Sequence, residues 1–329
     1  MKKYSLSIKN YGEHKARRWE KVKTAILFSG QGAQYAGMGK DLYHYYKESQ
    51  KIYDRASLLL DWNIKEVCFE DPNGLIHQTR YTQGALFTTN LAVYEAIKAK
   101  GIKVDSVLGF SLGEYSALVA SGVLDFDDAL RLVEKRAIYM DEAAMKVSGG
   151  MSAVIGLDRE VIDVVCKEVS LKGLTAEVAN DNCPGQVIIS GTKEGLEMAA
   201  AMLKEKGAKR VLPLSVSGPF HSSLMQEAAD KIKDDIEKIS FKDPVIPIVS
   251  NVTARTMTRD EIIENIPLQI IRGVRFRESI LYLLSQGYDT FIELGAKKTL
   301  CSFVSKISKE VRVMHVEDTK TLQNVLSAL

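Results

Sequence analysis

The stretch 109-GFSLGEYSAL-118 places one serine, Ser111, between two glycines at a tight corner of the chain. The apolar run SVLGF (106–110) before it predicts a buried strand, and EYSALVASG (114–122) after it predicts a helix. G-x-S-x-G between a strand and a helix is the pattern of a nucleophile elbow, which lifts the serine oxygen clear of the sheet. A Cβ at either glycine would collide with the neighbouring helix or strand. The pattern favours a nucleophilic serine over a chance surface turn.

Strand-like runs alternate with helix-like segments on both sides of this corner, which predicts an α/β fold. The segments that carry this pattern are a strand at 24–28, helices at 81–101 and 125–145 (the second opened by Asp125 or Asp127 as cap), and strands at 245–251 and 288–295. After SGG (148–150), four short strand-like runs and two helix-like runs follow in the order βαββαβ within about 65 residues, which is the ferredoxin-like split pattern.

Three parts are therefore expected. Residues 24–148 and 214–329 form a hydrolase-like parallel-sheet catalytic subdomain, and residues 149–213 form an inserted ferredoxin-like subdomain. Residues 1–23 form a basic extension with eight lysines and arginines and two glutamates. Such an extension is typical of a solvated terminus, and it also suits contact with an acidic partner or an anionic surface.

Composition narrows the classes of function. The 329 residues are 46% hydrophobic and 26% charged with a formal net charge of +2, as in a soluble globular protein with no general affinity for nucleic acid. No apolar run approaches the roughly 20 residues of a membrane span. Four scattered cysteines without a CxxC pair argue against zinc and against a disulfide framework. We expect a cytoplasmic protein that binds neither a metal nor a membrane.

A nucleophilic serine needs a base, and two of the five histidines are credible. His221 lies in VSGPFHSSLM, a Gly-Pro turn between a strand and a helix. Active-site residues of α/β proteins are commonly found in such loops at the ends of strands. His315 lies in VRVMHVED, inside an alternating strand where a histidine is more often structural. A serine hydrolase with Ser111, an intervening aspartate and His315 is the competing interpretation.

Two further features leave alternatives open. Arg136 adjoins an apolar helical stripe, where a guanidinium is costly unless an anion meets it, so it forms an internal salt bridge or waits for an anionic ligand. The run FSGQGAQYAGMG (28–39) has Tyr35 where the dinucleotide-binding motif requires glycine. Its glycines therefore predict a close backbone approach to something other than a phosphate.

Together these segments resemble the malonyl-CoA:acyl carrier protein transacylases of bacterial fatty acid synthesis, from about Thr24 to about Leu326. Six motifs occur in the order of that family. They are GQGAQ (30–34), YTQGAL (81–86), GFSLGEYSALVASGVL (109–124), RLVEKRA (131–137), CPGQV (183–187) and GPFHSSLM (218–225).

The resemblance implies a ping-pong acyl transfer. Ser111 would attack malonyl-CoA, releasing CoA, and the phosphopantetheine thiol of acyl carrier protein would then take the malonyl group. His221 would be general base and acid, oriented by the backbone carbonyl of Gln269. The backbone N–H groups of Gln31 and Leu112 would form the oxyanion hole. No cofactor of the enzyme's own is implied, because the partner protein carries the phosphopantetheine.

The resemblance also implies how the acyl group is selected. Arg136 would pair bidentately with the free malonyl carboxylate, and Gln83 would be a further substrate contact. Phe220 would crowd a branched extender such as methylmalonyl. The chain departs from the family at Phe110, where most relatives have histidine, at Ser29, where proline is usual, and at ELGAKKTL (293–300), which replaces E-x-G-P-G-x-x-L.

The partner expected from this resemblance is acyl carrier protein, whose helix is typically acidic. A basic rim beside the Ser111 cleft is therefore expected, and possible contributors are Lys204, Lys206, Lys209 and Arg210, although an ordinary solvated helix end fits them too. The other interpretations left open are a discrete acyltransferase that serves a polyketide synthase, the serine hydrolase, and a non-catalytic module that docks a carrier protein.

Overall fold

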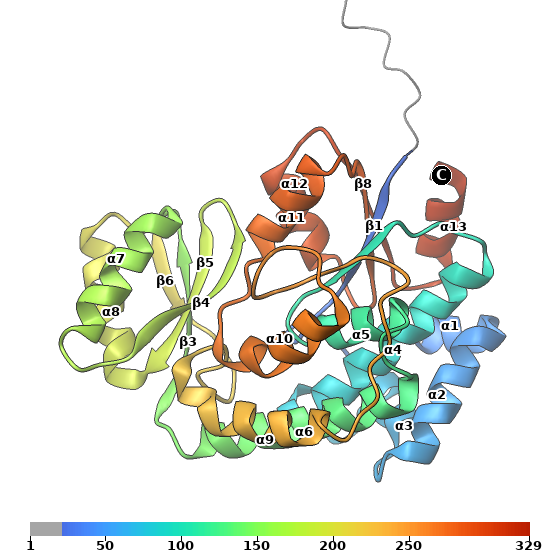
Figure 1. Ribbon diagram of the computed structural model, residues 1–329, viewed down its shortest axis with the longest axis horizontal. Helices are drawn as coiled ribbons and strands as arrows, with labels where there is room; N and C mark the ends of the chain where they lie inside the picture. Colours follow the sequence, from blue (N-terminus) through green and yellow to red (C-terminus); the bar gives the residue numbers. More distant parts are fainter. Residues whose placement is uncertain (1–21) are drawn as a thin grey trace, which may run out of the picture.

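Two β-sheets of opposite character lie side by side, one parallel and one antiparallel (Figure 1). The computed structural model describes residues 22–329. Residues 1–21, which make up nearly all of the expected basic extension, lie outside this described range. Among residues 22–329, no helix combines the length and the apolar character that a membrane crossing requires.

The parallel sheet has five strands in the order β7-β2-β1-β8-β9. Every neighbouring pair is parallel, and β1, β2 and β8 are buried along their whole length, as continuous apolar runs such as TAILF predict. The α/β fold with a parallel sheet is confirmed. The strands are β1 (Thr24–Phe28), β2 (Ser106–Gly109), β7 (Ile248–Val249), β8 (Thr290–Leu294) and β9 (Arg312–Val316).

Helices cover both faces of this sheet, because alternate residues of each strand point to opposite sides. Ala25 and Leu27 pack with α11 (Phe276–Ser285) and α12 (Thr299–Ile307). Ile26 and Phe28 face a thicker helical layer. That layer contains α1 (Lys40–Tyr45), α2 (Lys47–Leu59), α3 (Ile64–Phe69), η1 (Leu75–His77), α4 (Thr79–Ala99), α5 (Gly113–Ala120), α6 (Phe126–Met145), η2 (Ser223–Met225), α9 (Gln226–Ile236), α10 (Arg259–Ile271) and α13 (Thr319–Ala328).

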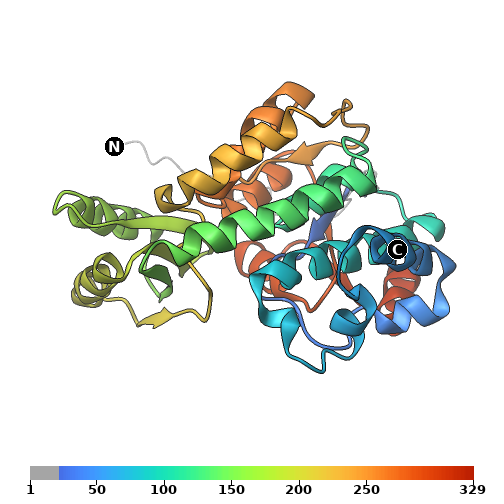
Figure 2. The ribbon, with the colours of Figure 1, turned by 90° about the horizontal axis from the view of Figure 1, so that it is seen from below.

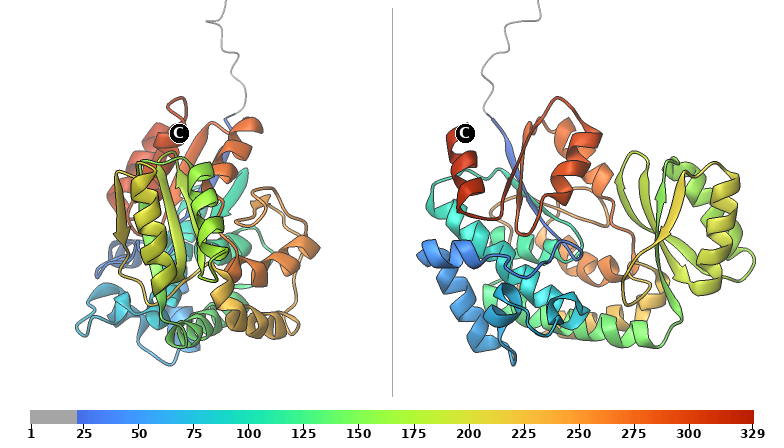
Figure 3. Two further views of the ribbon diagram at one scale, coloured as in Figure 1. Left: turned by 90° about the vertical axis from the view of Figure 1, so that its left-hand side faces the viewer. Right: turned by 180° about the vertical axis from the view of Figure 1, so that it is seen from behind.

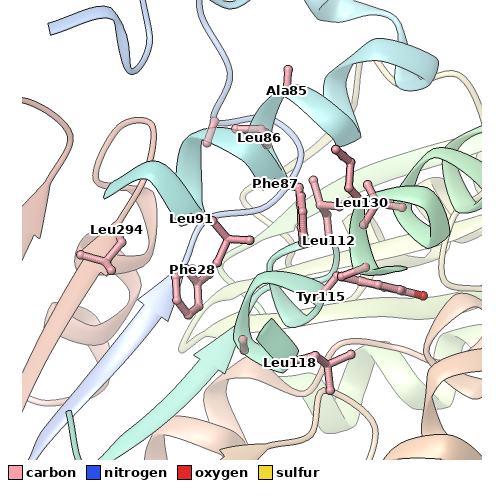
Figure 4. Packing of buried hydrophobic residues seen from close by; sticks show 14 of the residues in the cluster. Phe28, Ala85, Leu86, Phe87, Leu91, Leu112, Tyr115, Leu118, Leu130 and Leu294 are labelled. Carbon is pink, nitrogen blue, oxygen red and sulfur yellow. The ribbon is translucent and has the colours of Figure 1, made fainter. Parts of the chain in front are cut away.

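Helix α5, which follows the elbow, is enclosed by this layer. Figure 4 shows Tyr115 and Leu118 of α5 among Phe87 and Leu91 of α4 and Phe28 of β1, and all five are almost fully buried. A helix that is apolar on most sides is expected to lie inside the protein, as α5 does. Close packing therefore holds the start of α5 rigidly against the end of β1.

The antiparallel sheet has the strand order β4-β5-β3-β6 and carries two helices. Figure 3 shows these helices on the outer face of the sheet, where they share a small core of their own. On the inner face, Met151, Ala153 and Ile188 join the main core. The elements follow the predicted order βαββαβ, as β3 (Gly149–Ile155), α7 (Arg159–Ser170), β4 (Ala176–Cys183), β5 (Gln186–Thr192), α8 (Lys193–Glu205) and β6 (Arg210–Pro213).

Helix α6 connects the two sheets. It runs along the helical layer of the parallel sheet and leads into β3 four residues after it ends (Figure 2). Asp125 occupies its N-cap position, as predicted, but makes no capping hydrogen bond with its side chain. Asp127 lies inside the helix and pairs with Arg55 on α2 instead. The acidic side chains of the first turn still stabilise the helix, because their negative charge interacts favourably with the positive end of the helix dipole.

In the loop after β8, a lysine adopts a backbone conformation that usually requires glycine. Lys297 has a φ of 61°, in the left-handed region, and its backbone N–H donates to Glu317 Oε2 over 3.0 Å. A side chain in this region costs roughly 1–3 kcal/mol.

We expect Lys297→Gly to raise the free energy of unfolding by about 0.5–1 kcal/mol, because the relieved strain exceeds the added flexibility of the unfolded chain. Urea titration measures the change. Lys298→Gly is the matched control, because Lys298 has a φ of −139° and gains nothing from glycine. A Lys297→Gly protein that is less stable than the parent would contradict this prediction.

Candidate active site

The elbow at Ser111 needs both of its glycines. Ser111 itself has a φ of 51°, which brings the chain from β2 into α5 within three residues. A Cβ on Gly109 would lie 1.9 Å from the carbonyl carbon of Gly113, and a Cβ on Gly113 would lie 2.2 Å from the carbonyl oxygen of Phe28. The predicted collisions with helix and strand are confirmed, so the glycines allow the turn that presents the serine.

Asn251 holds this strained corner in place. Its Oδ1 accepts a hydrogen bond from the Ser111 backbone N–H over 2.7 Å, and its Nδ2 donates to the Gly109 carbonyl over 2.6 Å. The sequence analysis did not identify Asn251. Its position two residues after β7, which pairs with β2, is the available signal, because polar side chains at the carboxyl ends of parallel strands gather at one edge of the sheet.

His221 is paired on both ring nitrogens. Nε2 lies 2.7 Å from Ser111 Oγ, and Nδ1 lies 2.8 Å from the backbone carbonyl of Gln269. This carbonyl is free to accept because Gln269 lies in the last turn of α10, where carbonyls have no partner within the helix. Nδ1 must therefore carry the proton, which leaves Nε2 as the acceptor that faces the serine.

Burial, together with the nearby charge of Arg136, lowers the pKa of His221 to about 4. The ring is therefore neutral at physiological pH. Arg136 Nη2 also donates to Ser111 Oγ over 3.2 Å, so the serine hydroxyl directs its own proton toward His221 Nε2. The pair is arranged for transfer of that proton from serine to histidine.

Arg136 lies on α6 with 1% of its surface exposed. Nη1 donates to Gln83 Oε1 over 2.6 Å, and Nη2 donates to Gln269 Oε1 over 3.1 Å. Burial lowers the pKa of Arg136, and its guanidinium lies 5.3 Å from the centre of the Tyr115 ring. Nε has no hydrogen-bond partner in the described chain.

The internal salt bridge that the residues alone left open for Arg136 is not present among residues 22–329, where no carboxylate lies within ion-pair distance of it. Its hydrogen-bond partners are neutral amides and a hydroxyl. A buried cation without a direct counter-ion is costly, and an anion brought in by a ligand would remove that cost. The geometry therefore suits an acidic ligand at Ser111.

Two backbone N–H groups are available to a developing oxyanion. Gln31 follows Gly30, where a Cβ would lie 2.2 Å from the Phe110 carbonyl oxygen, so the β1 loop approaches the elbow closely. Leu112 directly precedes α5. Within the described part of the chain, neither the Gln31 nor the Leu112 N–H has an acceptor. Donors of this kind beside a nucleophile suit an anionic tetrahedral intermediate.

The site opens into a cavity of about 290 Å³ with walls from both sheets. The antiparallel sheet contributes Met151, Asn182 and Ile188, and Phe220 lies beside His221. Phe110 packs edge-on against Phe276 at 5.6 Å between ring centres, so an apolar cluster supports this side of the elbow. Asn182 Oδ1 is buried without a partner in residues 22–329, which leaves an acceptor for a ligand.

The other sequence candidates lie elsewhere. His315 is on β9, with Nε2 3.5 Å from Glu317 Oε1, and it does not line the cavity. The serine hydrolase that pairs Ser111 with His315 is therefore not supported. Among the described residues, none of the proposed rim residues lines this cavity, namely Lys204, Lys206, Lys209 and Arg210. The same range contains no group of three His, Cys, Asp or Glu residues that could hold a metal ion.

Glu114 was also missed in the sequence. It is 4% exposed and is the one charged residue of α5. Burial raises its pKa to about 7, against hydrogen bonds from Gln269 and Asn251 and the charge of Arg136. A lone acid in the apolar run EYSALVASG is the signal that could have identified it, because a buried carboxylate requires donors.

Comparisons with known proteins agree with this geometry. The family model described as "Acyl transferase domain" matches residues 26–324. The "Malonyl CoA-acyl carrier protein transacylase" of Bacillus subtilis (strain 168) is 42% identical over 308 residues, which cover 93% of this chain and 97% of that protein.

Two solved structures are similar over nearly the whole fold. The malonyl CoA-acyl carrier protein transacylase from Clostridium perfringens ATCC 13124 has a TM-score of 0.90 and 42% identity, covering 93% of this chain and 97% of that one. A malonyl-transacylase in complex with its type II polyketide synthase acyl-carrier protein also has a TM-score of 0.90, with 36% identity, covering 94% of this chain and 100% of that one.

Proposed function

Because the chain belongs to the acyl transferase family, we propose that it transfers the malonyl group of malonyl-CoA to the phosphopantetheine thiol of an acyl carrier protein. One observation carries this proposal. A neutral imidazole, a hydroxyl and a buried guanidinium meet at Ser111 Oγ, at 2.7 Å from His221 Nε2 and 3.2 Å from Arg136 Nη2. The hydroxyl and the imidazole suit acyl transfer, and the guanidinium suits an acyl chain that ends in a carboxylate.

In the first half-reaction, His221 Nε2 takes the Ser111 proton while Oγ attacks the thioester carbonyl. The negative oxygen that forms is held by the N–H groups of Gln31 and Leu112. As the tetrahedral intermediate collapses, the carbon–sulfur bond breaks, and His221 returns the proton to the departing CoA sulfur. A malonyl ester of Ser111 and free CoA remain.

The second half-reaction reverses these roles with a different thiol. His221 takes the proton of the phosphopantetheine thiol, and the sulfur attacks the malonyl ester. Collapse breaks the bond to Ser111 Oγ, which recovers its proton from His221. The phosphopantetheine belongs to the carrier protein, so the enzyme needs no cofactor of its own.

Selection of the acyl group rests on Arg136 and Phe220, which line the cavity, and on Gln83, which lies behind Arg136. The guanidinium of Arg136 pairs with the malonyl carboxylate, and Gln83 keeps Arg136 Nη1 in place over 2.6 Å. Phe220, which is 5% exposed and lines the cavity, leaves little room for a branch at the malonyl α-carbon.

Intact-mass analysis tests the proposal. After brief mixing with malonyl-CoA, we expect the protein to gain the mass of one malonyl group on Ser111, and holo acyl carrier protein should then remove it. Methylmalonyl-CoA and acetyl-CoA should label the protein less. A protein that stays unlabelled by malonyl-CoA, or that passes the group to water as fast as to the carrier, would contradict malonyl transfer.

The pKa of His221 gives a further prediction. Because its pKa is lowered to about 4, the base stays neutral as the pH falls from 8 to 5. The acylation rate should therefore stay level over that range in the Glu114→Gln protein, which lacks the buried carboxyl whose pKa is raised to about 7. The rate should fall by half near pH 4, which single-turnover measurements with malonyl-CoA can follow. Circular dichroism at each pH controls for unfolding. A midpoint near 6.5, the ordinary value for histidine, would contradict this role.

The proposed role is to supply malonyl groups for fatty acid synthesis in the cytoplasm. A polyketide assembly line is the second candidate, because one structural relative is bound to a polyketide synthase carrier. Transfer rates to purified fatty acid and polyketide carriers of the same organism distinguish the two roles. The preferred carrier should have the larger kcat/KM.

A further inference from the structure

Glu114 accepts hydrogen bonds from the two residues that hold the reacting pair. Its Oε2 accepts from the Gln269 side-chain amide over 2.9 Å and from the Asn251 backbone N–H over 3.2 Å. Gln269 holds His221 through its backbone carbonyl, and Asn251 holds the Ser111 N–H through its side chain. One buried carboxylate therefore lies directly behind both the base and the nucleophile.

The Gln269 amide can face only one way in this arrangement. Its Oε1 accepts from Arg136 Nη2 over 3.1 Å, and its Nε2 donates to Glu114 and, over 2.8 Å, to the Ser111 carbonyl. A turn of the amide by 180° would place its NH₂ against the guanidinium and its oxygen against the carboxylate. Both contacts would then be repulsive between buried groups, which fixes the amide.

We infer that Glu114 is a positioning residue, which sets the alignment of Ser111 and His221 by holding Gln269 and Asn251 from behind. Glu114 does not line the cavity, so it does not touch the substrate. The Gln269 amide also joins Glu114 to Arg136. Arg136, which would bind the acyl carboxylate, and His221, which would take the proton, are therefore both held by Gln269. This inference rests on the proposed acyl transfer.

Two substitutions at Glu114 separate the effect of side-chain length from the effect of charge. Glu114→Gln keeps the length of the side chain, and its amide oxygen can replace Oε2 as acceptor for both hydrogen bonds. Glu114→Asp keeps the charge but withdraws the carboxylate by one methylene. If position is what matters, glutamine should serve better than aspartate. If charge alone matters, the order should reverse.

The measured quantity is the single-turnover rate of Ser111 acylation, with malonyl-CoA and with acetyl-CoA. We expect Glu114→Asp to lower both rates by about 100-fold, the cost of a small misplacement of reacting groups, with KM little changed. Glu114→Gln should stay within about tenfold of the parent, because hydrogen bonds to a neutral acceptor are only modestly weaker.

Glu134 provides the matched control. It is a partly buried carboxylate on α6 whose Oε2 accepts from Trp62 Nε1 over 3.0 Å, and burial raises its pKa to about 7, as for Glu114. Glu134→Gln and Glu134→Asp should lower the melting temperature in the same manner and leave the acylation rates unchanged. Melting curves for all four variants distinguish loss of fold from loss of alignment.

The outcomes distinguish this inference from the proposed function. A parent protein that takes no malonyl group would contradict the function itself. A parent that is acylated normally, with a folded Glu114→Asp variant that is equally fast, would overturn the positioning role alone. Glu114→Gln as slow as Glu114→Asp, with both folded, would overturn it as well. If Glu114→Asp does not fold, the rate for Glu114→Gln within tenfold supports the inference, and a larger loss overturns it.

Discussion

Ser111→Ala should abolish the malonyl-enzyme and lower malonyl transfer to the carrier by about 10⁴-fold or more. Without Oγ no ester can form, so neither half-reaction can proceed through the enzyme. The neutral base and the free N–H groups would remain, and they would leave only a small rate of direct transfer between the two thiols. Intact mass and carrier acylation both measure the loss.

The matched control is Ser285→Ala, at an exposed serine that bonds only its own helix end and a neighbouring side chain. It should transfer malonyl at the parental rate. Ser111→Ala should melt close to the parent, because Asn251 still accepts from the backbone N–H at position 111. A malonyl adduct on the Ser111→Ala protein would mean that another residue is the nucleophile.

Arg136→Ala should lower malonyl loading by about 10²–10³-fold while acetyl loading falls by no more than about tenfold. The malonyl carboxylate would enter a buried site without a cation, whereas acetyl has no carboxylate to lose. A smaller common loss is expected because Arg136 also bonds Gln269 and Ser111. The ratio of the two acylation rates is therefore the informative quantity.

Arg136→Lys is the control that keeps the positive charge but loses the two separate NH₂ groups of the guanidinium. A single ammonium cannot reproduce the separate bonds of Nη1 to Gln83 and of Nη2 to Gln269, so we expect it to recover only part of the malonyl rate. Equal losses for malonyl and acetyl in Arg136→Ala would remove carboxylate recognition from this residue.

Local pattern explains which parts of the fold the sequence could predict. The elbow follows from five residues, because two glycines and a strand-to-helix change leave few other conformations. The βαββαβ order of residues 149–213 follows from alternating apolar runs of adequate length. The cap of α6 was only partly predictable, since a side chain at Asp125 can cap a helix or face solvent with little difference in energy.

The supports of the site could not be predicted because they join residues far apart in the chain. Asn251 lies 140 positions from Ser111, and Gln269 lies 155 positions from Glu114. Neither pair shares a motif or a spacing rule. Arg136 shows the same limit, since its residue type and helical position allowed two interpretations. Only the structure shows that amides, and not a carboxylate, surround its guanidinium.

Ser111 and His221 share one backbone property, a positive φ of 51° and 58° respectively. L-amino acids with side chains resist this conformation by roughly 1–3 kcal/mol each. Glycine at either position would relax the chain and erase the chemistry. Ser111→Gly and His221→Gly should therefore raise resistance to heat while ending turnover, so this fold carries backbone strain at the two residues that react.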